Sequence, residues 1–249
     1  LTSSTISGLG MTLGIAYTGF ELLRLDLSAG NDELHIDGTH ATRTKVNGAN
    51  GADLFNIESI SGDTIIFGDP VATDPNAATY GDTFRVNYNE FGVQTERNGV
   101  VGELTLHGRR GSDQYFIGLA GSGGAIINVL DESAGDPLGI DVLNVFGTNA
   151  NEYFLVRANI DRTLGMIAAV QTDQNGDPVP GGSIERINYD GDINGGVIIH
   201  GRSGDDTFIL DDNLASMVIN GDAGDDKFQI GQVFQSPRDG TNPNNGLAS

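Results

Sequence analysis

The sequence contains no cysteine and no tryptophan, and aromatic residues make up only 7% of its 249 residues. Without cysteine there is no disulfide framework, so stability outside a cell must come from packing or from bound metal. No apolar run approaches the length of a membrane-spanning helix, and the residues after Leu1 do not form a signal peptide. We therefore predict no membrane insertion, and we interpret a start without methionine as a segment of a larger protein.

Positive charge is also scarce, because 13 Lys and Arg residues face 34 Asp and Glu residues and the formal net charge is -21. Repulsion of this size opposes compaction unless cations neutralise it, and it disfavours nucleic acid as a partner. The simpler interpretation is a solvated acidic surface that keeps the protein soluble. The acids lie largely in repeated glycine-rich turns, which favours bound cations over a merely solvated surface.

Glycine is abundant, with 37 residues, and a glycine-rich acidic chain can be disordered. Disorder is excluded here by one pattern, in which an acid ends a glycine-rich turn and large apolar residues follow two and four positions later. The acids of this pattern are Asp32, Asp53, Asp82, Asp113, Asp141, Glu152, Asp206 and Asp226. The residues two positions on are Leu34, Phe55, Phe84, Tyr115, Leu143, Phe154, Phe208 and Phe228. A period of two predicts strands with one buried face.

Four of these turns also share the upstream pattern apolar–Asn/His–Gly–x–x–Gly–x–Asp, and their first glycines are Gly48, Gly108, Gly201 and Gly221. Two glycines three positions apart suit a tight corner with positive-φ positions. Each unit is then strand, sharp turn and strand. A spacing of roughly 20 residues between acids fits one coil of a solenoid.

The organisation along the chain follows from these units. We predict an all-β, right-handed parallel β-solenoid (β-roll or β-helix) over residues 1–234, with irregular inserted loops such as residues 69–80. Residues 157–187 show no legible unit, and they form either degenerate coils or a hairpin that closes at residues 175–178. The Ser-, Pro-, Asn- and Gly-rich residues 235–249 are predicted to be a polar linker or a frayed tail.

The units resemble the glycine- and aspartate-rich repeats of the RTX family of secreted bacterial proteins, whose pattern is G-G-x-G-x-D-x-U-x with U apolar. The best matches are residues 201–208 and 221–228, and residues 48–55 and 108–115 follow the same scheme. The resemblance implies a parallel β-roll, calcium between stacked turns, and export without a cleaved signal. The family repeats its nonapeptide in tandem, whereas here one copy occurs per coil. We therefore expect calcium on one edge only.

Calcium prefers six to eight oxygen ligands, and stacked glycine-rich turns offer backbone carbonyls together with carboxylates. The predicted metal ligands are Asp32, Asp53, Asp113, Asp205, Asp206, Asp222, Asp225 and Asp226. The alternative is that each aspartate only caps its own turn by accepting hydrogen bonds from local N–H groups. Arg109 and Arg202 stand where other turns have small or acidic residues, and they either neutralise a neighbouring turn's carboxylate or are solvated.

No nucleophile–base motif is present, so we predict a structural or interaction module rather than an enzyme. Its expected setting is a large secreted or cell-surface bacterial protein, and its expected partners are calcium ions and neighbouring repeats of a longer parent chain. Contact with a cell surface or a polysaccharide is left open. The alternative is a β-helix lyase or epimerase that acts on acidic polysaccharide, an analogy at the level of fold alone.

Overall fold

The structure is a computed structural model that describes residues 1–8, 11–70, 80–132, 139–173 and 175–231. Within these residues the chain is all-β and contains no helix, and thus no helix long and apolar enough to cross a membrane. The predicted polar tail at 235–249 and most of the predicted inserted loop at 69–80 lie outside the described residues.

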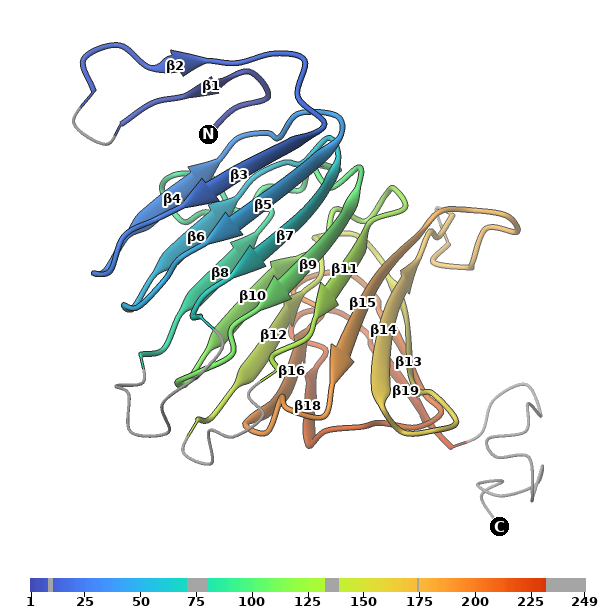
Figure 1. Ribbon diagram of the computed structural model, residues 1–249. Coiled ribbons are helices and arrows are strands. Elements are labelled where there is room, and N and C mark those ends of the chain that lie inside the picture. Colours follow the sequence, from blue (N-terminus) through green and yellow to red (C-terminus); the bar gives the residue numbers. More distant parts are fainter. Residues whose placement is uncertain (9–10, 71–79, 133–138, 174, 232–249) are drawn as a thin grey trace.

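Two large sheets make up most of the molecule (Figure 1). The seven-stranded sheet is parallel throughout and contains, in spatial order, β4 (Glu33–Ile36), β6 (Leu54–Ile57), β8 (Thr83–Val86), β10 (Gln114–Gly118), β12 (Val142–Phe146), β16 (Gly196–His200) and β18 (Met217–Asn220). The ten-stranded sheet contains β3 (Leu22–Asp26), β5 (Arg43–Asn47), β7 (Asp63–Phe67), β9 (Glu103–His107), β11 (Ile126–Val129), β15 (Ile184–Asp190), β14 (Leu164–Val170), β13 (Tyr153–Ala158), β17 (Thr207–Leu210) and β19 (Lys227–Ile230).

The chain passes back and forth between the two sheets, so each strand of one sheet is followed by a strand of the other from β3 to β13 and again from β15 to β19. Turns that lead from the ten-stranded to the seven-stranded sheet form what we call the first edge. Turns that lead back form the second edge. Because all strands but β14 run parallel within their sheets, successive turns of one kind stack on one another along each edge.

A short antiparallel pair, β1 (Thr5–Ile6) and β2 (Ile15–Ala16), lies over the N-terminal end of the sheets (Figure 1). Leu1 and Tyr17 beside this pair are buried. Leu1 is hydrogen-bonded to the backbone at His35 and Asp37, so this segment covers the β4 end of the seven-stranded sheet.

One insertion breaks the regular alternation, because β13, β14 and β15 follow each other within the ten-stranded sheet. β14 is antiparallel to both neighbours, and the β14–β15 connection is closed by the carboxylate of Asp173, which accepts from the backbone N–H groups of Asn175 and Asp177. Of the two interpretations of residues 157–187, the hairpin is therefore confirmed. The ten-stranded sheet gains two strands here that the seven-stranded sheet lacks.

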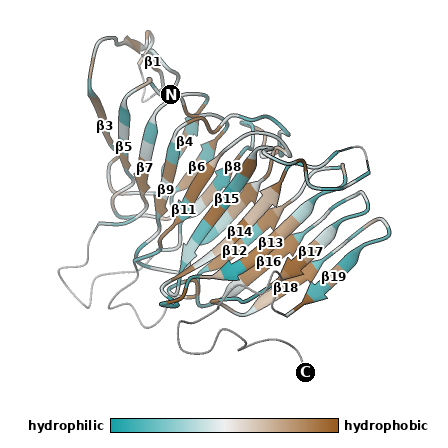
Figure 2. Cartoon of the chain, turned by 90° about the vertical axis from the view of Figure 1, so that its right-hand side faces the viewer, coloured by the Kyte–Doolittle hydropathy of each residue, from teal (hydrophilic) through white to brown (hydrophobic). Residues whose placement is uncertain are grey.

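The core lies between the two sheets and consists of the residues predicted to face inward. Figure 2 shows hydrophobic and hydrophilic segments alternating along the strands, as a period of two requires. The rings of Phe55, Phe84 and Tyr115 stack with centroids 5.1 and 5.0 Å apart, and Phe208 stacks between Phe154 and Phe228 at 4.9 and 5.0 Å. All of these residues but Phe228 are fully buried.

The inward prediction is wrong at the C-terminal end of the stack. Phe228 is 50% exposed and Ile230 is 77% exposed. The physical reason is that their strand, β19, is the last described strand of its sheet and pairs only with β17.

The repeated acids do not all lie on one edge, whereas the expectation of calcium on one edge only stays a prediction. Asp32, Asp53, Asp82, Asp113 and Asp141 precede strands of the seven-stranded sheet and lie on the first edge, whereas Glu152, Asp206 and Asp226 precede strands of the ten-stranded sheet and lie on the second. The motif changes edge between β12 and β13.

Candidate metal centre

The two glycines of each turn have different roles. The second glycine has positive φ, as at Gly111 (104°), and a Cβ there would collide with the backbone oxygen of Tyr80 in the neighbouring turn. The first glycine makes room for a carboxylate instead, because a Cβ on Gly108 would collide with Oδ2 of Asp113. The residue after the first glycine also has positive φ, although it is Arg109 here. The spacing of the glycines is thus set by close approach as much as by backbone conformation.

The acids of the first edge are tied together through their Oδ1 atoms. In each case Oδ1 accepts a hydrogen bond from the backbone N–H of the acid in the preceding turn. The pairs, donor first, are Asp32 and Asp53 (2.8 Å), Asp53 and Asp82 (2.8 Å), Asp82 and Asp113 (2.6 Å), and Asp113 and Asp141 (2.8 Å). The aspartates therefore do cap N–H groups, but those groups belong to the neighbouring turn rather than to their own.

The second carboxylate oxygen, Oδ2, is not used in these hydrogen bonds. Oδ2 of Asp53, Asp82 and Asp113 is buried and accepts no hydrogen bond from any residue that the structure describes. A buried carboxylate oxygen without a partner is costly, and its charge must be cancelled by a proton or a cation.

Three buried carboxylates converge on the first edge, those of Asp113, Asp131 and Asp141. One oxygen of each lies within 4.8 Å of one oxygen of the others, so the group could hold a metal ion. The hydroxyl of Tyr115 donates to Oδ1 of Asp131 at 2.7 Å and itself accepts from the N–H of Gly108 at 2.8 Å. This chain of hydrogen bonds fixes the carboxylate of Asp131 against the turn that carries Asp113.

The protonation of these acids is strongly perturbed. Burial, together with the charges of Asp131, Asp82 and Asp141, raises the pKa of Asp113 to about 10. Burial likewise raises the pKa of Asp82 to about 8. A divalent ion would supply the positive charge that keeps such carboxylates ionised at neutral pH.

Sequence reasoning named Asp113 as a ligand but missed Asp131 and Asp141. Asp141 is one of the repeating acids, but its turn lacks the paired glycines of the motif. Asp131 lies two residues after the end of β11 and has no glycine just before it. The only signal for Asp131 in the sequence is its position two residues after a strand. Asp222 occupies the same position after β18.

The turns that match the motif best lie on the second edge and are more open. Asp206 accepts from the N–H of Glu152 at 2.8 Å, and Asp226 accepts from that of Asp206 at 3.0 Å. Burial raises the pKa of Glu152 to about 7 and that of Asp206 to about 6.

The remaining predicted ligands of this edge are exposed, namely Asp205, Asp222 and Asp225. Asp205 accepts from the N–H of Asp225 at 2.9 Å, and Asp222 is 3.2 Å from His200 and from the N–H of Arg202. Among the described residues, the three-carboxylate group around Asp113 has no counterpart here.

The two arginines in the turns have separate partners. Arg109 lies over the ring of Phe67 at 4.0 Å and forms an ion pair of 3.6 Å with Glu132, which follows the neighbouring strand β11. It thus neutralises a neighbouring turn's carboxylate, as one of the two interpretations predicted.

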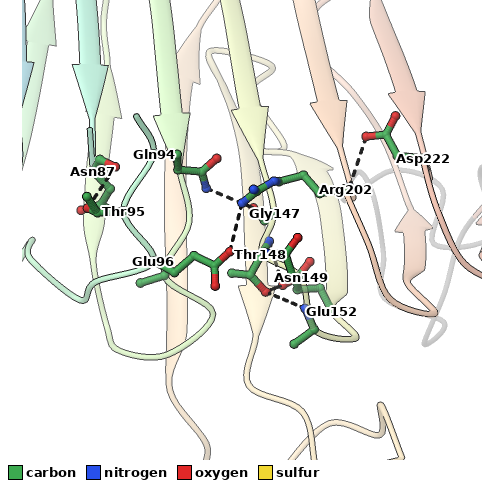
Figure 3. A network of polar contacts seen from close by, with 12 residues as sticks. Asn87, Gln94, Thr95, Glu96, Gly147, Thr148, Asn149, Glu152, Arg202 and Asp222 are labelled. Carbon is green, nitrogen blue, oxygen red and sulfur yellow. Dashed lines mark hydrogen bonds and ion pairs between the residues drawn. The ribbon is translucent and has the colours of Figure 1, made fainter. Parts of the chain in front are cut away.

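Arg202 instead pairs at 3.1 Å with Glu96, which lies in the long connection between β8 and β9. The same Glu96 accepts from Asn149 at 2.8 Å, and Gln94 donates to the carbonyl of Gly147 at 3.1 Å (Figure 3). This connection therefore fastens two second-edge turns together.

Comparison with known proteins identifies no relative. No family model matches the chain, and no curated protein and no solved structure is significantly similar to it.

Proposed function

We propose that the chain is a calcium-binding structural module, a right-handed parallel β-solenoid of the RTX type in a large secreted or cell-surface bacterial protein. The observation that carries the proposal is the convergence of Asp113, Asp131 and Asp141, three fully buried carboxylates with oxygens within 4.8 Å of one another. Carboxylates placed so closely in a dry site repel each other unless a cation lies between them.

The chemistry of the donors favours calcium among the common cations. The converging atoms are all hard oxygens, without nitrogen or sulfur, which is the set that calcium and magnesium prefer. Calcium accepts irregular arrangements of six to eight oxygens, whereas magnesium demands near-ideal octahedral geometry. Stacked turns, with carboxylates and carbonyls from different passes of the chain, suit the more tolerant ion.

The proposed mechanism is coupled binding and folding. With a net charge of -21, the acidic turns repel one another where calcium is scarce, as in a cytoplasm. Outside the cell, calcium would fill the turns and allow them to stack. The absence of cysteine fits a module that is stabilised by metal rather than by disulfides.

Further repeats of a parent chain are the proposed neighbours of the module. Among the described residues β19 has a strand on one side only, and its Phe228 and Ile230 side chains are exposed. These features suit the stacking of another unit of the same kind.

We place the polysaccharide lyase or epimerase second and propose no mechanism for it. Such an enzyme needs basic residues that converge on one groove. Arg109 and Arg202 lie on opposite edges, and Arg157 is paired with Asp211 at 3.1 Å. No observation favours this alternative.

The proposal is tested by far-UV circular dichroism and thermal melting of the full chain in chelator, in calcium, and in magnesium at equal ionic strength. We expect β-structure and melting temperature to rise with calcium and much less with magnesium. Equal spectra and melting temperatures in all three conditions would refute it, and would leave protonated, hydrogen-bonded aspartates as the explanation of the stacked first-edge acids.

A further inference from the structure

The inserted strands open a cleft on the second edge. In the seven-stranded sheet β10 and β12 are neighbours, whereas the strands that follow them in the chain, β11 and β13, are separated by β14 and β15. Each extra strand adds about 4.8 Å. The turns at 119–125 and 147–152 therefore start side by side and end roughly 10 Å further apart than elsewhere. A cleft of about 370 Å³ lies between them, closed at its side by the ends of the β14–β15 hairpin.

Two buried carboxylates line this cleft from different walls. Glu185, at the start of β15, is 3% exposed, and both of its oxygens accept from the N–H of Ala120 at 3.1 Å. Glu152, in the turn before β13, is 5% exposed, and its Oε1 accepts from the N–H of Thr148 at 3.0 Å. Oε2 of Glu152 is buried and has no hydrogen-bond donor among the described parts of the chain.

The rest of the lining is polar and uncharged, apart from the exposed Asp173. It includes Ser122, Asn151, Gln171 and Thr172, and no basic or aromatic side chain is among the described lining residues. Burial raises the pKa of Glu152 and of Glu185, and none of the described lining residues carries a positive charge that could compensate these carboxylates. The cleft is thus negative, and it presents hydroxyl and amide groups around the two acids.

The size of the cleft points to an organic ligand rather than a bare metal ion. Among the described residues only Asp113, Asp131 and Asp141 bring three carboxylates close enough to hold a metal ion together, and none of them lines this cleft. A volume of about 370 Å³ is in the range of small-molecule sites.

We propose that this cleft binds a small polyhydroxylated organic cation of the amino-sugar class. The ammonium group would lie against Glu152 and Glu185, and the hydroxyl groups would exchange hydrogen bonds with the serine, threonine and amide side chains of the lining. Ion pairing in a buried site gives the affinity, and the polar lining gives the orientation. The site does not depend on the proposed calcium centre, which lies on the other edge.

The test is titration of the full chain with glucosamine at neutral pH in excess calcium, followed by saturation-transfer NMR and calorimetry. Glucose, which has the same ring without the ammonium group, is the matched neutral probe. Glu185→Gln keeps an oxygen for the N–H of Ala120 but removes the charge. Glu33→Gln, on an exposed residue of β4, is the control for loss of charge elsewhere. Ser122→Trp is a second variant, which adds bulk at an exposed lining residue and leaves both carboxylates in the sequence.

We expect saturable binding of glucosamine, at least about tenfold weaker binding of glucose, and a similar loss in Glu185→Gln and Ser122→Trp but not in Glu33→Gln. Equal binding of glucose and glucosamine, or unchanged binding in Glu185→Gln with its melting temperature preserved, would overturn the proposal. So would binding of glucosamine that appears only in chelator, because the cleft would then take the metal ion itself.

Discussion

Two turns with the same pattern behave differently, the first-edge turn of Gly108, Gly111 and Asp113 and the second-edge turn of Gly201, Gly204 and Asp206. In both, the aspartate is buried and accepts from the N–H of the preceding acid. Burial and neighbouring acids raise the pKa of Asp113 to about 10, but that of Asp206 only to about 6. The motif therefore specifies the turn, and the surroundings decide how strongly a cation is needed.

The surroundings differ in the residue that the next turn contributes. Beside Asp113 this residue is Asp131, which is buried and held by Tyr115. Its positional equivalent near Asp206 is Asp222, which is exposed and bonded to His200. The carboxylate that completes the group on the first edge is thus turned to solvent on the second.

The largest expected effect is the pH dependence of the metal-free protein. The pKa of Asp113 and of Asp82 is raised to about 10 and about 8, from a usual value of 3.8, so the folded state holds protons that the unfolded state has lost. Their stabilisation is complete below pH 3.8 and is lost as the pH rises through the folded pKa values. Each retained proton changes the free energy of unfolding by up to about 1.4 kcal/mol per pH unit.

Thermal melts in chelator between pH 5 and pH 9 measure this slope. We expect Asp113→Asn to flatten it and Asp226→Asn to leave it nearly unchanged. A stability in chelator that does not fall with pH would show that the first-edge acids are not buried as described.

The next effect is the difference in stability between losing a buried ring and losing an exposed ring of the same aromatic stack. Phe208→Ala removes a fully buried ring between two others and should cost about 3–5 kcal/mol. Phe228→Ala, at the half-exposed end of the same stack, should cost less than half as much. Denaturant unfolding of both variants measures the two losses of unfolding free energy. Equal losses would mean that a further unit covers Phe228 in solution.

The two edges are compared directly by removing one charge from each. Asp113→Asn keeps the oxygen that accepts from the N–H of Asp82 but loses the charge. We expect it to remove about 2–3 kcal/mol of calcium-dependent stabilisation, the amount that a ligand at about 100 times its Kd contributes. Asp226→Asn should lose less, since Asp226 lies at the open end. The comparison requires thermal melts of each variant in calcium and in chelator. A larger loss of calcium-dependent stabilisation in Asp226→Asn than in Asp113→Asn would place the main calcium centre on the second edge instead of the first.

The smallest effect is expected at Arg202. Its ion pair with Glu96 is partly exposed, so Arg202→Ser should change the free energy of unfolding by less than about 1 kcal/mol. Arg109→Ser should cost more, because the guanidinium of Arg109 is more buried and packs on Phe67. Equal losses in urea unfolding would contradict this ranking.

Much of the strand pattern could be predicted from the sequence. The apolar residues two and four positions after each acid identify strands because a sheet with one buried face imposes a period of two. What could not be predicted is the change of edge. The turn before Tyr153 ends in an acid with apolar residues two and four positions later, as earlier turns do, and nothing in it indicates that the strand after it belongs to the ten-stranded sheet.

The metal centre was predictable only in part, for a similar reason. Asp113 is marked by its glycines, whereas Asp131 is brought beside it by the stacking of β11 on β9, a contact between passes of the chain. Motif quality favoured Asp206 and Asp226, since sequence shows the conformation of a turn but not how many acids its neighbours bury against it.

The central claim is tested most directly by a crystal structure of the calcium-soaked protein, with anomalous diffraction recorded to locate the ion. The account predicts an anomalous peak between the carboxylates of Asp113, Asp131 and Asp141, with oxygen distances of about 2.3–2.6 Å. Crystals grown in excess calcium that show no peak at these three residues, with their carboxylates only hydrogen-bonded to the chain, would contradict it.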